Sequence, residues 1–331
     1  MQLPAARGRV SAALIDVLSG RAAKLPAFAR FDGEEDLHLT LFVCYELAYR
    51  GWDGVDDCWE WDPGMLRLRT AAENRFLGTL HDLVGEPARD VDPAAVPAGL
   101  AEVVAADDGP GLSGYLRGRA THEQFKEFVT HRSIYHLREA DPHSWALPRL
   151  GGRAKAALVE IQTDEYGGGV ERRMHQELFK RTMSWFDLDL TYGAYVDAVG
   201  APTLAVNNLM SLFGLHRRRR GMILGHLAAY EMTSSLPNRS YANGLRRLGG
   251  DADATAFYDE HVEADAVHEQ IAAYDLCGSF AAAEPALAGD VLFGARCALA
   301  VDSLWAGSIL DTWRNGGSSL RDYTIQPVLA G

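Results

Sequence analysis

Helical periodicity fills most of this chain, and no stretch alternates apolar and polar residues for long enough to predict a strand. The apolar runs lie between glycine- and proline-rich breaks, and no fixed-period repeat links them. The helices expected from these runs span residues 36–50, 65–84, 121–140, 155–166, 171–184, 192–199, 203–215, 222–234, 254–273 and 288–313. The sequence therefore predicts an all-α helical bundle.

A stretch rich in proline, alanine, aspartate and glycine, residues 86–112, divides the helical pattern. We expect a loop there with at most one short helix. Residues 1–112 are predicted to be an N-terminal helical extension that packs on the core or dimerises it, and residues 113–331 to be the core. Because the N-terminal helices have apolar faces with no other evident cover, a homodimer is expected.

Charge and cysteine content exclude several classes of protein. The net charge of −13 argues against a surface for nucleic acid or anionic membranes. No window reaches about 18 uninterrupted apolar residues, which argues against a membrane span. The basic run at 216–220 is predicted to be a helix end or solvated corner rather than a phosphate site. The four cysteines form no C-x-x-C pair and no zinc spacing, and no signal peptide is evident, so a cytoplasmic protein with reduced thiols is expected.

The segment EHVEADAVHE, residues 260–269, contains a candidate metal-binding triplet. His261, Asp265 and His268 stand at i, i+4 and i+7, so on an α-helix their side chains fall within about 60° of one another. Two imidazoles and a carboxylate suit iron, manganese or zinc. The alternative is a charged, solvated helix face, because three glutamates surround the triplet. A metal site needs further ligands from elsewhere.

Three further segments offer such ligands. Glu139 lies near the end of the helix that begins with Thr121 as predicted N-cap, and Glu165 precedes His175 by ten residues. The glycines at 167–169 remove the constraint of a straight helix. Three helices can then direct ligands to one interior point, which is the logic of carboxylate-bridged two-metal centres. An oxygen-activating iron site also needs open positions for dioxygen and substrate.

The chain from about residue 125 to 313 resembles the iron-containing redox enzymes, the haem-oxygenase-like diiron oxidases. The resembling motifs are EFVTHRSIYHLREADPHSWALPRL, ALVEIQTDEYGGG, MHQELF, LFGLHRRRRGMILGHLAAYEM and HVEADAVHEQI, with YELAYRGWDGVDDCWEWDP upstream. The resemblance implies a haem-oxygenase-like helical bundle. It also implies that the metal ligands and catalytic residues are Glu139, Glu165, His175, His261, Asp265 and His268.

One position departs from the family pattern. Many members have a glutamate three residues before the histidine of the second core helix, where this chain has Arg172. Either Glu171, at i−4 from His175, substitutes for it, or one iron is held less well, or the second metal is labile. An arginine near the cluster can also bind a substrate carboxylate.

The resemblance implies an oxidoreductase with Fe(II), two ions per chain, as cofactor and O2 as cosubstrate. We expect a peroxo-diferric species to oxidise a small organic substrate, amino-acid-like or fatty-acid-like, by N-oxygenation, C–C cleavage or desaturation-type chemistry, with an external electron donor possible. The alternative is a non-catalytic metal-binding helical protein that acts through a partner. Haem oxygenase chemistry needs one proximal histidine and no carboxylate cluster, so the six-residue set argues against it.

Several other side chains have two interpretations. His226 and Glu231 are either substrate contacts or, as we favour, a satisfied buried polar pair. Tyr166 either bonds an iron-bound species or is an aromatic beside a turn. Surface or helix-end positions are expected for the histidines that flank Glu139, and core or interface positions for the last two tryptophans: His131, His136, His143, Trp305 and Trp313.

Overall fold

The computed structural model describes residues 1–25 and 30–321, except for the side chains of residues 263–267. This part of the chain forms helices and turns, without strands. The α-helices are α1 (Arg9–Leu18), α2 (Glu34–Glu46), α3 (Pro63–Val84), α4 (Val96–Ala105), α5 (Leu112–Gly118), α6 (His122–His136), α7 (Asp141–Ser144), α8 (Gly152–Glu165), α9 (His175–Trp185), α10 (Ala201–Gly214), α11 (Arg220–Thr233), α12 (Ser235–Arg247), α13 (Ala252–Gln270), α14 (Ser279–Ala283) and α15 (Ala288–Arg314). The prediction of an all-α fold is therefore confirmed.

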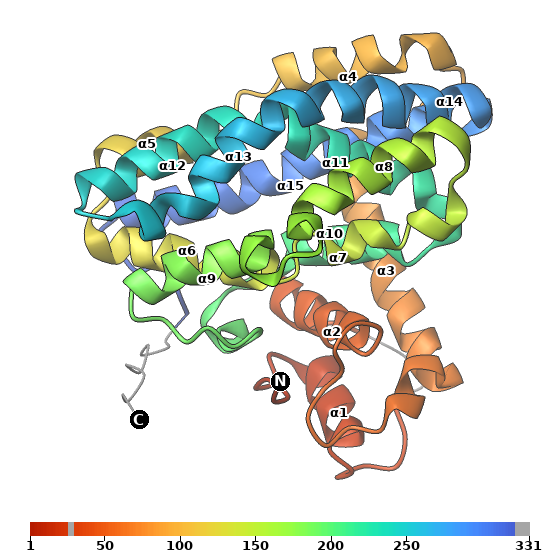
Figure 1. Ribbon diagram of the computed structural model, residues 1–331. Coiled ribbons are helices and arrows are strands. Elements are labelled where there is room, and N and C mark those ends of the chain that lie inside the picture. Colours follow the sequence, from red (N-terminus) through yellow and green to blue (C-terminus); the bar gives the residue numbers. More distant parts are fainter. Residues whose placement is uncertain (26–29, 322–331) are drawn as a thin grey trace.

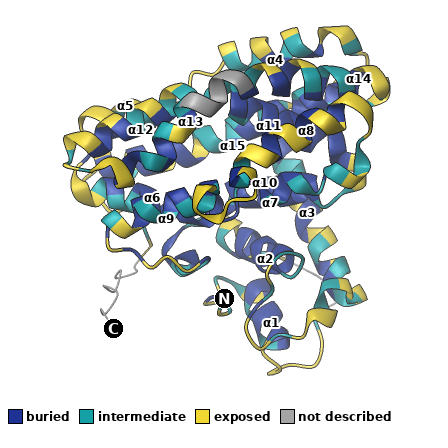
Figure 2. Cartoon of the chain, in the orientation of Figure 1, coloured by how far each residue is buried: buried dark blue, intermediate teal, exposed yellow. Residues whose placement is uncertain are grey.

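The long helix α15 is the axis of the bundle (Figure 1). It packs along α11 and also contacts α10, α4 and α3. Gly225 of α11 permits the closest approach, because a Cβ atom there would overlap the carbonyl oxygen of Val291 in α15. A larger residue at this position would push the two helices apart. Buried residues, dark blue in Figure 2, are frequent in α10, α11 and α15.

The N-terminal helices α1 and α2 lie beneath the bundle, and α3 rises from them toward α15 (Figure 1). α2 is apolar on several faces and packs against α1, α3 and α10, so its residues 36–46 are all buried within the chain. The apolar faces that suggested self-association are thus covered by other helices of the same chain. Buried side chains from 1–112 and from 113–321 join in one hydrophobic cluster, and the division at residue 112 stays a prediction.

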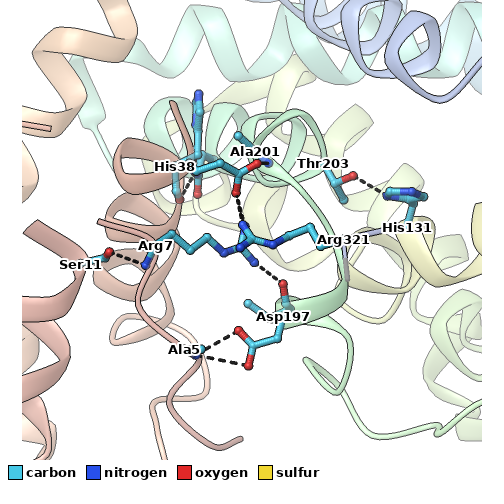
Figure 3. Close-up of polar contacts among 12 residues, drawn as sticks. Ala5, Arg7, Ser11, His38, His131, Asp197, Ala201, Thr203 and Arg321 are labelled. Carbon is cyan, nitrogen blue, oxygen red and sulfur yellow. Dashed lines mark hydrogen bonds and ion pairs between the residues drawn. The ribbon is translucent and has the colours of Figure 1, made fainter. Parts of the chain in front are cut away.

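Polar contacts join the N-terminal segment to distant parts of the chain (Figure 3). Glu35 accepts from Arg7 at 2.9 Å, from Arg321 at 2.5 Å and from the backbone N–H of Ala201 at 2.7 Å. The backbone N–H of Ala5 donates to Asp197 at 3.0 Å. Arg7 is almost fully buried, with 2% of its side chain exposed. The N-terminal segment is therefore part of the folded body.

Most expected helices are present, with some boundaries shifted. Thr121 caps α6 through a capping box with Gln124, as predicted, but the helix ends at His136 instead of 140. The helix predicted over 171–184 begins at 175, and the helix expected at 254–273 continues as a π-helix, Ile271–Gly278. α12 was not predicted.

The helix predicted over 192–199 was wrong, because only a 3₁₀ turn, Val196–Ala198, forms there. Gly193 has a positive φ angle of 79°, which interrupts a helical backbone within this segment. The backbone N–H of Val196 then bonds the carbonyl oxygen of Gly193, three residues earlier, as in a 3₁₀ turn. Among the described residues, no helix combines the length and the apolar composition needed to cross a membrane.

Candidate metal centre

Three residues from different elements bring ligand atoms together inside the bundle. Glu139 lies in the turn after α6, His175 is the first residue of α9, and His261 lies in α13. One ligand atom from each lies within 4.8 Å of those of the other two. Both histidines are buried, and only 11% of the Glu139 side chain is exposed. A single divalent cation fits among such donors.

Glu165 joins this group because the chain reverses direction after α8. All three glycines at 167–169 have positive φ angles of 62–77°, and they form a 3₁₀ turn. A Cβ atom on Gly167 would lie 2.5 Å from the backbone carbon of Arg173, so the turn needs glycine there. The reversal brings Nδ1 of His175 to 3.1 Å from Oε2 of Glu165, at the end of α8.

A second pair lies beside the first group. Nδ1 of His268 is 3.3 Å from Oε2 of Glu231, which α11 supplies. Glu231 and Glu165 line the same cavity, and the charge of Glu231 contributes to the raised pKa of Glu165. Glu231 was not among the ligands predicted from the sequence. A carboxylate within the otherwise apolar run GMILGHLAAYEM was the available signal, since such a charge is rarely buried without a partner.

The partners of two histidines fix which nitrogen faces the cluster. Nδ1 of His261 bonds the carbonyl oxygen of Phe257 at 2.7 Å, so Nδ1 donates and Nε2 keeps a lone pair toward Glu139. Nε2 of His268 bonds Oδ2 of Asp164 at 2.9 Å, which directs Nδ1 toward Glu231. Metal-binding histidines are oriented in this way by carboxylate and carbonyl acceptors.

Buried ligand atoms in both groups have no hydrogen-bond partner among the described residues. These atoms are Oε2 of Glu139, Oε2 of Glu165, Nδ1 of His175 and Nδ1 of His268. The close His175–Glu165 and His268–Glu231 approaches are therefore misaligned for hydrogen bonds. Buried polar atoms without partners are rare in native proteins, and a missing ion is one explanation. The donor set, carboxylates and imidazoles, fits iron.

The charges of the cluster shift its pKa values strongly. Burial lowers the pKa of His175, but Glu165 and Glu139 outweigh it and raise that pKa to about 9. Burial and the neighbouring His175 lower the pKa of His261 to about 3. Burial raises the pKa of Glu139, yet His136, His261 and His175 bring it down to about 2. Protons thus neutralise part of the cluster, and a cation that binds must displace them.

Of the six ligands predicted from the family resemblance, Glu139, Glu165, His175 and His261 come together, and His268 lies in the adjoining pair. Asp265 lies outside the described residues, because only the backbone of 263–267 is given. Glu171 and Arg172 are both exposed and occupy a 3₁₀ turn before α9. Glu171 therefore does not share a helix face with His175, contrary to expectation.

The histidines around Glu139 are buried instead of lying on the surface, and His136 and His143 lie in the last turns of α6 and α7, in line with the helix-end alternative. Nδ1 of His136 bonds Glu139 at 2.9 Å, and Nδ1 of His131 bonds the hydroxyl of Thr203 at 2.7 Å. Nε2 of His143 lies 3.2 Å from Nδ1 of His226. The favoured His226–Glu231 pair does not form, because each residue has a different partner.

The remaining aromatic expectations have mixed outcomes. The Tyr166 hydroxyl donates to Asp141 at 2.8 Å instead of facing the cluster. Trp305 and Trp313 are buried in the core as expected. Trp305 also lines a cavity of about 440 Å³ that begins at Glu139, Glu165 and His261. The cavity offers room for a small molecule next to the cluster.

The fold and the cluster define an all-α protein with a buried carboxylate–histidine site of the kind that binds metal in helical bundles. Residues 126–303 match the family model described as iron-containing redox enzyme, and the chain belongs to this family. The haem-oxygenase-like fold, an oxidoreductase class and iron as the metal follow from this membership, which confirms the resemblance seen in the sequence.

Among the proteins to which the chain is similar are one characterised enzyme and one solved structure. The chain is 29% identical over 138 residues to the nitrosourea synthase of Streptomyces achromogenes subsp. streptozoticus, which covers 41% of this chain and 29% of that enzyme. It thus matches less than a third of the relative. A CADD-like protein of unknown function from Nostoc punctiforme PCC 73102 aligns with 72% of this chain and 97% of its own, with 16% identity and a TM-score of 0.47.

Proposed function

We propose that this protein is a non-haem diiron oxidoreductase that uses O2 to oxidise a small organic substrate in the cavity beside the cluster. The observation that supports this most is the set of buried carboxylate and imidazole atoms without hydrogen-bond partners, of which those of Glu139 and Glu165 belong to residues that line that cavity. The oxygen-activating route expected from the family resemblance is part of the proposal. Two ferrous ions, when bound, supply electrons to dioxygen.

The two groups of residues suggest how two ions are shared. Glu139, His175 and His261 would hold one ion, and Glu231 and His268 the other. Glu165 would hold the first ion together with His175, and its charge also acts on Glu231 and His268 of the second group. Asp265 stays a predicted ligand. The replacement of the expected glutamate by Arg172 removes one carboxylate from the family pattern, and Glu231 supplies a carboxylate from another helix.

The surrounding residues hold the ligands in place. Asp164 and the carbonyl oxygen of Phe257 orient His268 and His261, and His136 holds Glu139. A small substrate in the cavity would lie against Tyr135 and Leu227, which exclude water from the inner end. A homodimer, a cytoplasmic location and an external electron donor stay predictions from the sequence.

Anaerobic reconstitution with ferrous iron, followed by metal counting and exposure to O2 with visible spectroscopy, tests the proposal. We expect about two irons per chain, as in carboxylate-bridged bundles, and an oxygen-dependent absorption band. His261→Ala and Glu165→Ala should lose the band. The control His122→Ala removes a histidine with 49% of its side chain exposed and should keep it.

The alternative of a non-catalytic metal-binding protein makes a different prediction. A non-catalytic protein would bind iron but show no oxygen-dependent absorption band, whether or not amino acids or fatty acids are added. That result would contradict the proposed oxidase. Oxygen consumption that depends on one organic compound would contradict the alternative.

A further inference from the structure

The same cavity also contains a half-buried ion pair. Nη2 of Arg132, on α6, lies 3.1 Å from Oδ1 of Asp302, on α15. The Arg132 guanidinium also stacks on the Trp305 ring, with its carbon 3.9 Å from the ring centroid. Only 12% of the Arg132 side chain is exposed, and all three residues line the cavity. The guanidinium is therefore held in one orientation with an edge toward the cavity.

The other polar groups around the Arg132–Asp302 pair include acidic and neutral side chains but, among the described residues, no second arginine or lysine. Asp107, in the loop after α4, also lines the cavity, and burial together with Asp302 raises its pKa. The hydroxyls of Tyr230 and Tyr241 lie beside the guanidinium as neutral partners. Asp107, Asp108 and Asp302 thus place three carboxylates around a cavity whose lining, in the part of the chain that the structure describes, has one guanidinium. A ligand with both charges improves this balance, since its cation approaches the aspartates and its anion replaces the weaker phenol acceptors.

The spacing along α6 relates this pair to the cluster. Arg132, His136 and Glu139 follow at intervals of four and three residues, so they lie on one face of the helix and its following turn. Seven residues correspond to roughly 10 Å along a helix. A substrate bound at Arg132 by one end can therefore extend along the cavity toward the cluster.

We propose that Arg132 and Asp302 are specificity-determining residues that bind the carboxylate and the ammonium group of an amino-acid substrate. This inference rests on the proposed function, and it selects between the amino-acid-like and fatty-acid-like substrates left open there. Arg132 offers two parallel N–H groups to the carboxylate, and Asp302 accepts from the ammonium. A fatty acid supplies the anion alone, which leaves Asp302 and Asp107 beside a further carboxylate.

Calorimetry on the iron-loaded, anaerobic protein tests this inference. The probes are the protein amino acids and, for each ligand found, the matched carboxylic acid without its α-amino group. We expect the amino acid to bind at least about tenfold more tightly than the matched acid. Asp302→Asn should bring that ratio to about one, and Arg132→Lys should weaken the amino acid at least about tenfold, because lysine lacks the paired N–H groups.

The control Arg153→Lys alters an exposed arginine–aspartate pair and should leave both affinities unchanged. Equal affinity for amino acid and matched acid, a preference that survives Asp302→Asn, or no binding of any amino acid would each overturn the inference. Iron counting and the oxygen-dependent band are measured separately on the same samples. A missing band with an Asp302-dependent preference refutes the oxidase alone, and a band without the preference refutes the head-group site alone.

Discussion

The buried ion pair between Glu46 and Arg138 offers the sharpest test of how the N-terminal segment supports the site. Nη1 of Arg138 lies 2.7 Å from Oε1 of Glu46, and the two side chains are 1% and 0% exposed. The Tyr192 hydroxyl donates to the same carboxylate oxygen at 2.8 Å. Arg138 directly precedes Glu139, so α2 acts on the turn that holds a proposed ligand.

Removal of one partner leaves the other charge buried without compensation. We expect Glu46→Gln and Arg138→Met each to lower the free energy of unfolding by about 3–5 kcal/mol. The double variant should be much less destabilised than the sum, because neither charge remains, with a coupling energy above about 2 kcal/mol. The exposed pair Arg153–Asp275 is the control, and its coupling should stay below about 1 kcal/mol.

Urea unfolding, followed by circular dichroism, measures these energies. For each ion pair it is carried out on the unchanged protein, the two single variants and the double variant. Additive losses from Glu46→Gln and Arg138→Met, with coupling below about 0.5 kcal/mol, would refute the reasoning. Iron affinity of the same variants provides a second readout. We expect it to fall about 10–100-fold in the single variants, as for residues that orient metal ligands.

Three further predictions concern other parts of the molecule. Glu231→Ala should reduce bound iron from about two per chain toward about one, measured by metal analysis, and unchanged iron would show that Glu231 is not a ligand. Gly225→Ala should lower the free energy of unfolding by about 1–3 kcal/mol or more, because its Cβ overlaps the Val291 carbonyl oxygen, while Gly307→Ala, with open space around it, should not. Burial lowers the pKa of His131 to about 4, so the unfolded chain binds the proton first as pH falls below about 6.5, and stability should drop by about 3 kcal/mol by pH 4. His131→Gln should flatten this part of the stability–pH curve, and an unchanged slope would argue against the assignment.

The sequence predicted the helical bundle because apolar periodicity and capping are local properties. Thr121 and Gln124 lie within one helical turn, so their capping box could be predicted from the sequence alone. Helix α12 was not predicted, because its short sequence SLPNRSYANGLRR contains proline, glycine and two asparagines, which are poor helix formers in isolation. Its burial against α5 and α13 stabilises it instead.

The site was predictable only in part. His261 and His268 share one helix, and their spacing was informative, whereas Glu231 reaches His268 from α11, thirty-seven residues earlier in the chain. Such a contact depends on how α11 and α13 pack, which periodicity cannot give. The burial of His136 and His143 was not predicted for the same reason, because a polar side chain is expected to be exposed unless a buried partner is known.

The contacts of Glu35 have a consequence for how this chain folds during synthesis. Its partner Arg321 lies 286 residues later, and the partner of Ala5 lies 192 residues later. At roughly 5–20 residues per second, a ribosome needs about 15–60 s to add the chain between Glu35 and Arg321. The helix α2 is synthesised early. The helix α10, which packs against it, and Arg321, which pairs with Glu35, are synthesised later. Newly made chains should therefore depend on chaperones more than a bundle of locally paired helices does.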